Sequence, residues 1–584
     1  MMTETRVRIA VWGGTALLLA GLATFHQITN YFTLALVLVA TVGLEYYDRR
    51  NPTDSPTNLL ISARIIVYTA LLIIAGGVLR HTLNTGAKLP LDVYEQPLFV
   101  VHGFTRESLW WVTALWVAGL VLVFTRGGLY PGAVSWQSME HGQLFRVFTM
   151  VLVITMAWYT STLAYNEYMG QFYGVERILI VVFAVLVWFN PWFIVPSFML
   201  ALMMVYQLAY PFPTTTIDKT LLWESLYLLL TFVVLRVVVR IQPHHALLAL
   251  LVLAAAHYNY AGFSKLATEG APLAWVYDSG LDNLYIASYQ HGWLSMLPEA
   301  TALQIAGLIG TPLGEIGLNG FALVAEAGML AVLFNRRVAL VALALQFLLH
   351  AGIVAATGIF FWKWMVVLVA LGWWMVRLWN TDALTALYRP VVIAGALLLT
   401  LAVRHTTDVQ IFYWFNTPVN HIYELKAVTE DGEVYHVPRR MMEPDAIYFM
   451  QNELWGLSED LHISRISGTT ATYEDYTRIK ETEDIRAYIA EYGEIRYSEF
   501  FEQLFTEYMR RVFDTPHQHR WIDRIASPTH INYTYHGDDR YDGETPIRAI
   551  RVVMRTTYYT GHSIEVLDEK VVTEIPIVWE AAAR

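Results

Sequence analysis

Long apolar runs separated by short polar stretches dominate the chain as far as residue 403. Most of these runs are about as long as a helix that crosses a bilayer, which takes roughly 20 residues. About thirteen runs are predicted to span the membrane: 8–25, 31–47, 59–79, 108–125, 147–165, 177–190, 192–210, 220–239, 246–263, 319–335, 337–358, 361–378 and 390–403. The pattern predicts an all-α polytopic membrane domain.

The pattern changes after residue 403, where short alternating segments replace the apolar runs. Tyr423–Thr429 and Glu433–Val437 flank an Asp-Gly turn, which is typical of a β-hairpin. Ile547–Thr556 and Lys570–Val578 are predicted as further strands. The chain is therefore divided into N-terminal transmembrane helices (1–145), a second transmembrane domain (146–403) and a C-terminal α+β domain (404–584).

One amphipathic helix is predicted within the C-terminal domain, over Ser498–Phe513. Its apolar residues fall on one side and are expected to pack in that domain's core: Phe500, Phe501, Leu504, Phe505 and Tyr508. No nucleophile–base motif and no phosphate-binding loop occurs in this part of the sequence. A role in presenting substrate or capping a membrane site fits it better than separate catalysis.

Composition supports the membrane class. The 584-residue chain is 55% hydrophobic with a mean hydropathy of +0.40. It has no cysteine, which excludes disulfides and thiol catalysis. From His405 onward the chain has 31 acidic and 18 basic residues, which gives this part a net charge of −13. Because the whole chain has a net charge of −11, the part before His405 has a net charge of +2. This acidic balance argues against nucleic-acid binding.

Basic residues predict the orientation, because cytoplasmic loops are enriched in Lys and Arg. With a cytoplasmic N-terminus, the inside loops collect most of the arginines, among them Arg49, Arg50, Arg236, Arg240, Arg336, Arg337, Arg377 and Arg389. The prediction is a multi-pass protein of the cell membrane with an extracytoplasmic C-terminal domain. Membrane lipid is its expected environment.

Lys265 ends the apolar run that begins near Ala246. The chain has only seven lysines, and a lysine differs from arginine in that burial can leave it neutral and able to act as a base. His257 and Ala261 precede it on the same helical face. The alternative is a lysine whose ammonium reaches the lipid headgroups.

Lys363 is placed at the same outer face, within an aromatic cluster that is also typical of a membrane interface. Residues 264–318 form a long outer segment, and such a length predicts re-entrant or interfacial pieces that line a pocket. The cluster and the segment contribute aromatic residues, including Trp275, Phe361 and Trp362.

His350 and Glu326 lie inside apolar runs. Ionisable groups at this depth usually face a cavity or each other, so a functional site is one interpretation and an interhelical hydrogen bond the other. His244-His245 has neither an acidic neighbour nor a third histidine, and no metal site is expected.

A family resemblance appears at two places. Residues 257–266 (His-Tyr-Asn-Tyr-Ala-Gly-Phe-Ser-Lys-Leu), followed by Trp275, resemble the signature of vitamin K-dependent γ-carboxylases and their bacterial relatives. His350, followed by Gly358-Ile359-Phe360, is similar to a second, looser motif of that family. The resemblance covers roughly residues 146–378, the so-called HTTM region. Ser264 departs from it, standing where the animal enzymes have a second lysine.

The resemblance implies an enzyme that couples oxidation of a reduced naphthoquinone by O2 to the addition of CO2 to glutamate in a peptide or protein. It implies that Lys265 removes a proton from the hydroquinone and that His350 stabilises the later carbanion. Residues expected to contact the quinone are His257, Tyr260, Trp275, Phe361 and Trp362. The alternative is a non-catalytic lipophile-binding membrane protein or a transporter.

Overall fold

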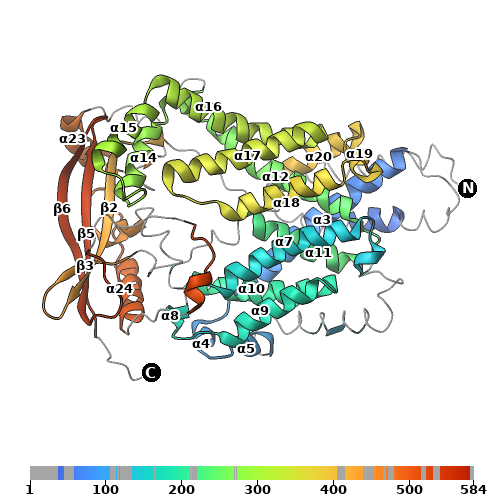
Figure 1. Ribbon diagram of the computed structural model, residues 1–584, viewed down its shortest axis with the longest axis horizontal. Helices are drawn as coiled ribbons and strands as arrows, with labels where there is room; N and C mark the ends of the chain where they lie inside the picture. The colour runs from blue at the N-terminus through green and yellow to red at the C-terminus, as the bar shows by residue number, and fades with distance from the viewer. Residues whose placement is uncertain are drawn as a thin grey trace, which may run out of the picture.

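The computed structural model is mostly helical, with a small antiparallel sheet in its C-terminal part (Figure 1). It describes residues 37–44, 58–105, 135–163, 166–210, 220–237, 239–268, 273–403, 415–438, 453–463, 481–514, 521–530 and 539–578, with a few single residues between them. The predicted spans 8–25, most of 31–47 and most of 108–125 lie outside these residues.

Apart from a helical stretch at 37–44, the helical part of the described chain lies within residues 58–403. Its α-helices are α3 (Asn58–Ala87), α4 (Leu91–Tyr94), α5 (Phe99–Thr105), α7 (Gly142–Ser161), α8 (Asn166–Met169), α9 (Gly174–Val187), α10 (Ile194–Tyr206), α11 (Leu221–Arg236), α12 (Pro243–Leu266), α13 (Ala274–Asp278), α14 (Leu281–Gln290), α15 (Glu299–Ile309), α16 (Pro312–Gly328), α17 (Arg336–Thr357), α18 (Trp362–Arg377), α19 (Asp382–Leu387) and α20 (Pro390–Val403). A 3-10 helix, η5 (Met329–Leu333), continues α16.

Five helices of the described residues are long and apolar enough to cross a membrane: Asn58–Asn84, Gly142–Ser161, Pro243–Leu266, Pro312–Leu333 and Arg336–Thr357. The prediction of about thirteen spans is therefore not supported. The runs at 177–190, 220–239 and 361–378 contain helices of 14, 16 and 16 residues, shorter than the ~20 residues that the hydrocarbon core requires. The run at 192–210 is divided between α10 and two 3-10 turns.

Helix α12 is the centre of the bundle. It packs against α3 and α11 on one side and against α16, η5 and α20 on others. Of an 18-residue apolar stretch of this helix, 89% is buried. The corresponding 18-residue apolar stretches of the α16–η5 segment and of α17 are only 28% and 33% buried. This pair therefore turns apolar side chains outward, as a lipid-facing hairpin would.

Local signals set the ends of the helices that carry the candidate site. Pro243 opens α12, where the missing N–H costs nothing, and the His245 ring accepts the Gln242 N–H at 2.9 Å. Asn335 caps α17 through the Arg337 N–H at 2.8 Å. Gly358 ends α17 with φ +72, a left-handed conformation that glycine adopts easily, and Trp293 packs where its side chain would be.

The outer segment predicted over 264–318 contains three short helices, α13, α14 and α15. It is shorter than predicted, because α16 begins at Pro312 instead of near residue 319. Asn319 donates to the Val276 carbonyl at 3.2 Å, which fixes α13 against α16. The segment thus covers one end of the bundle.

The C-terminal part contains a four-stranded antiparallel sheet in the order β3-β2-β5-β6. Its strands are β2 (Val419–Thr429), β3 (Val434–His436), β5 (Ile547–Tyr559) and β6 (Ile564–Pro576); β1 (Phe415–Asn416) pairs separately with β4 (Thr469–Thr470). The predicted hairpin is confirmed as β2–β3, with Gly432 at φ +91 in its turn. The two later strands are confirmed as the hairpin β5–β6, with β6 beginning earlier than predicted.

The predicted amphipathic helix is confirmed as α24 (Glu499–Phe513), capped by Ser498, and α23 (Thr482–Tyr492) precedes it. Phe505 and Tyr508 are buried as expected. Phe500 is 69% exposed, so its predicted place in the core is wrong. Phe500 points away from the core because the apolar face that α24 packs against its neighbours is narrower than predicted.

The sheet lies at one end of the bundle (Figure 1). Asn283 of α14 donates to the Asn416 carbonyl at 3.2 Å, and Asn416 donates to the Ser279 carbonyl at 2.7 Å. Phe360, which precedes α18, donates to the His530 carbonyl at 2.6 Å. The C-terminal part therefore packs on the end of the bundle where α17 stops and α18 starts.

Candidate functional site

Lys265 lies in the last turn of α12, and its side chain is 7% exposed. Its ammonium is 2.5 Å from the Oε2 atom of Glu326 on α16, whose side chain is 13% exposed. The ring of Trp275 faces the same ammonium at 5.0 Å from the ring centroid. The interpretation of Lys265 as a cation directed to the headgroups is not supported, because its charge meets the half-buried Glu326 carboxylate.

A close approach of two backbones brings this pair together. A side chain on Gly262 would collide with Ala327, whose nitrogen lies 2.4 Å from the position of a Cβ. Asn259, one turn earlier, donates to the Ala327 carbonyl at 3.2 Å. Small residues allow helices to pack this closely in a membrane. The contact therefore sets Lys265, one turn after Gly262, beside Glu326.

A second pair lies on the same face of α12. Tyr258 is two turns before Lys265, and its hydroxyl is 2.8 Å from Nε2 of His350 on α17. Nδ1 of this buried histidine has no hydrogen-bond partner among the described residues. Glu326 also interacts electrostatically with Tyr258. The faces of α12, α16 and α17 thus present an ion pair and an imidazole with an available nitrogen.

Only some of the predicted quinone-contacting residues adjoin these two pairs. Trp275 faces Lys265, and Phe361 packs against the His350 ring with centroids 5.1 Å apart. Tyr260 donates to the Leu401 carbonyl of α20 at 3.3 Å. Trp362 packs against Trp158 at 5.7 Å. Tyr260 and Trp362 therefore make their contacts on other elements.

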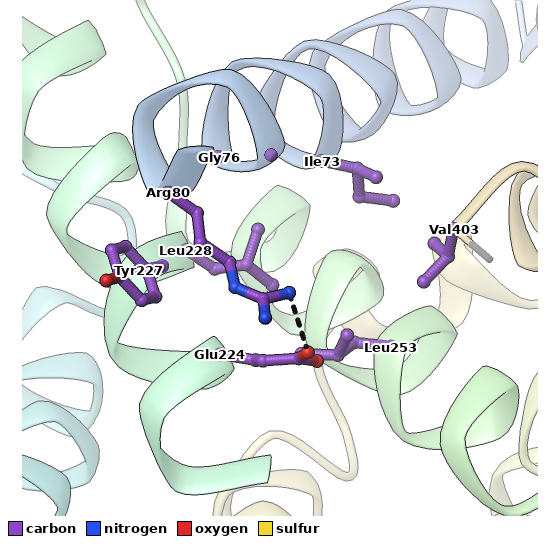
Figure 2. Close-up of a pocket in the computed structure, with 9 residues that line it drawn as sticks. Ile73, Gly76, Arg80, Glu224, Tyr227, Leu228, Leu253 and Val403 are labelled. Carbon is purple, nitrogen blue, oxygen red and sulfur yellow. Dashed lines mark hydrogen bonds and ion pairs between the residues drawn. The ribbon is translucent and has the colours of Figure 1, made fainter. Parts of the chain in front are cut away.

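His257 belongs to a different cluster, on the side of α12 that faces α3 and α11. Its Nε2 is 2.5 Å from Oε2 of Glu224, and Arg80 reaches the other carboxylate oxygen at 3.2 Å. Figure 2 shows the Arg80 side chain extended from α3 toward Glu224. The side chains of this triad are 1–6% exposed.

A cavity of about 20 Å³ adjoins the triad, lined by Ile73, Gly76, Gly77, Arg80, Glu224, Tyr227, Leu228, Leu253 and Val403 (Figure 2). This volume suits about one water molecule. Neither Lys265 nor His350 lines it. The cavity is therefore too small for a quinone and separate from the outer pairs.

Sequence reasoning missed Arg80, Glu224 and the role of Glu326 as a partner. Glu224 is a lone acid within the predicted run 220–239, which is a detectable signal for an intramembrane group. Arg80 falls just beyond the predicted end of a run, but α3 continues to Ala87. Only the packing of the helices shows which charges meet.

Comparison with known proteins adds no relative: no family model, no curated protein and no solved structure matches the chain.

The triad is expected to stabilise the bundle. Arg80→Met should lower the free energy of unfolding by roughly 3–5 kcal/mol, because it leaves the Glu224 carboxylate buried without its cation. The double variant Arg80→Met/Glu224→Met should be more stable than Arg80→Met alone. Thermal unfolding of the purified protein in detergent measures both effects.

Arg511→Met is the matched control, because the Arg511–Glu95 pair is 32% and 42% exposed and such pairs contribute less than about 1 kcal/mol. Equal destabilisation by Arg80→Met and Arg511→Met, or a double variant weaker than Arg80→Met, would contradict a buried ionic triad.

Proposed function

We propose that this protein is a membrane enzyme that removes a hydroxyl proton from a reduced, lipid-soluble naphthoquinone. The observation that carries the proposal is the pair of the buried Lys265 with Glu326, beside an aromatic ring. Ionisable groups inside a membrane domain are rare and mark functional sites. The resemblance of residues 257–275 to the γ-carboxylase signature supplies the substrate class.

Glu326 gives the pair its base. Removing both charges from water costs several kcal/mol per ion. This cost reduces the free-energy difference between the charged pair and the pair in which both groups are neutral. Glu326 takes one proton from the Lys265 ammonium across their hydrogen bond, leaving a neutral amine. Lys265 then accepts the hydroxyl proton and becomes an ammonium again. The site ends with one added proton, held on Glu326.

The ammonium formed at Lys265 stabilises the negative charge left on the substrate oxygen in this water-poor surrounding. Trp275 and Phe361 supply apolar, stackable faces near the two pairs. His350 offers Nδ1 as a donor or acceptor for a second reacting group. These roles need no metal.

The fuller proposal is a carboxylase. The reduced quinone supplies the electrons for reaction with O2, and the overall change is hydroquinone, O2, CO2 and a glutamyl residue to quinone epoxide, γ-carboxyglutamyl residue and water. His350 stabilises the glutamyl carbanion before CO2 adds. The substrate is a glutamate-containing peptide or protein, presented at the end of the bundle that the C-terminal part covers.

The proposed orientation places that end outside the cell and the N-terminus in the cytoplasm. Because the chain has no cysteine, an introduced one is unique. His562→Cys, in the exposed β5–β6 turn, should react with a membrane-impermeant maleimide in intact cells. Arg337→Cys, at the start of α17, should react only after permeabilisation. The reverse pattern would exclude this orientation.

The function is tested with purified protein in lipid, supplied with a reduced naphthoquinone and O2. Wild type should consume O2 and form quinone epoxide. Lys265→Ala and Glu326→Gln should each lower the rate at least about 100-fold, the usual scale of general acid–base catalysis. Lys265→Arg should fail similarly, because a guanidinium does not release its proton. A small added amine should partly restore Lys265→Ala.

The matched control is Lys88→Ala, which removes an exposed lysine outside the candidate site and should keep the wild-type rate. No oxidation by wild type, or full oxidation by Lys265→Arg, would remove the enzyme interpretation. Tight binding of the quinone without turnover would then favour a lipophile-binding protein.

A further inference from the structure

A ten-residue segment of the C-terminal part lies against the bundle near His350. This segment, residues 521–530, begins with the 3-10 turn η9 (Trp521–Ile525) and is called the strap below. Trp158 of α7 donates to the Ile525 carbonyl at 2.7 Å, and the Ser527 N–H donates to Thr162 Oγ1 at 3.1 Å. Two hydrogen bonds therefore attach the middle of the strap to the C-terminal end of α7.

The end of the strap makes a reciprocal contact with the chain before α18. The Phe360 N–H donates to the His530 carbonyl at 2.6 Å, and Nδ1 of His530 is 3.3 Å from the Phe360 carbonyl. Because a carbonyl only accepts, this bond places the imidazole proton on Nδ1. Nε2 is then the unprotonated nitrogen.

The His530 ring continues the aromatic contacts of the candidate site. It meets Phe361 edge-to-face at 5.0 Å and Trp364 at 6.3 Å. Phe361 in turn packs against His350 at 5.1 Å. One aromatic ring therefore separates His530 of the C-terminal part from His350 of the membrane domain.

We infer that His530 is a positioning residue of the membrane site: its Nδ1–H···O bond to Phe360 and its ring hold Phe361 against His350 and shield that histidine. The C-terminal part then completes the site instead of only covering it. The kinetic consequence rests on the proposed function, but the shielding does not.

The charges around His530 agree with a fixed neutral ring. Lys363 of α18 and His350 of α17 are the titratable groups that interact with it from the bundle. Burial and the Lys363 charge lower the pKa of His530 to about 4, against the bond to Phe360, which raises it. At neutral pH the ring therefore keeps one proton, on the nitrogen that bonds Phe360.

The test compares His530→Asn, His530→Gln and His530→Ala in the full-length protein. An Asn amide nitrogen lies near the position of Nδ1 and retains a donor for the Phe360 carbonyl, whereas a Gln amide lies near the position of Nε2. His562→Gln, an exposed histidine in the β5–β6 turn, is the matched control. Thermal unfolding establishes that each variant is folded.

The first readout needs no turnover. Diethyl pyrocarbonate modifies accessible neutral imidazoles, and peptide mass spectrometry measures the extent at His350. Wild type, His530→Asn and His562→Gln should protect His350, while His530→Ala and His530→Gln should raise its modification several-fold. Equal modification of His350 in wild type and in folded His530→Gln would overturn the inference.

The second readout is quinol oxidation. His530→Gln and His530→Ala should lower kcat about tenfold with KM nearly unchanged, and His530→Asn should stay within about twofold of wild type. If His530→Asn is as slow as His530→Ala, loss of the bond to Phe360 does not explain the lower kcat, and the positioning role is wrong. If wild type has no oxidation but the modification pattern holds, the proposed function fails and the shielding by His530 stands.

Discussion

The close contact of α12 and α16 at Gly262 and Ala327 is the constraint on which the candidate site depends. A Cβ on Gly262 has no room, because the Ala327 backbone occupies its position. The two helices therefore approach at backbone distance, which brings the side chain one turn after Gly262 to the side chain that precedes Ala327. Lys265 and Glu326 are those side chains, and neither charge is tolerable in an apolar bundle without the other.

Helix α12 carries two clusters of charge on different faces, and their surroundings differ. The Arg80–Glu224–His257 triad closes on itself: each carboxylate oxygen has a donor, and the adjoining cavity holds about one water. The outer face leaves Nδ1 of His350 without a partner among the described residues and surrounds the pairs with aromatic rings. The first arrangement suits stability, and the second suits a reacting ligand.

Helices and hairpins were predicted well from the sequence where their signals lie within a short stretch of the chain. The run predicted over 246–263 is α12 (Pro243–Leu266), and the hairpin at Gly432 and the helix after Ser498 follow from a turn signal and from periodicity. The predicted number of spans is not supported, because hydropathy does not distinguish a spanning helix from a shorter buried one. Helix α11 has 16 residues and is almost wholly buried within the bundle.

The candidate site was predicted only in part. Lys265, His350 and Glu326 stood out as ionisable groups in apolar runs. The sequence could not pair Lys265 with Glu326, assign His257 to Glu224, or bring His530 from the C-terminal part to Phe360. Each of these contacts joins residues far apart in the chain and depends on how the helices pack.

In the proposed mechanism, Glu326 receives a proton when Lys265 acts as the base. Reaction-induced infrared difference spectroscopy of the protein in lipid, after addition of a reduced naphthoquinone, tests it directly. Wild type should gain a carbonyl band of a protonated carboxylic acid, and this band should be absent from Glu326→Gln and from Lys265→Arg. A wild-type spectrum with no carboxylic-acid band, or the same band in Glu326→Gln, would contradict the account.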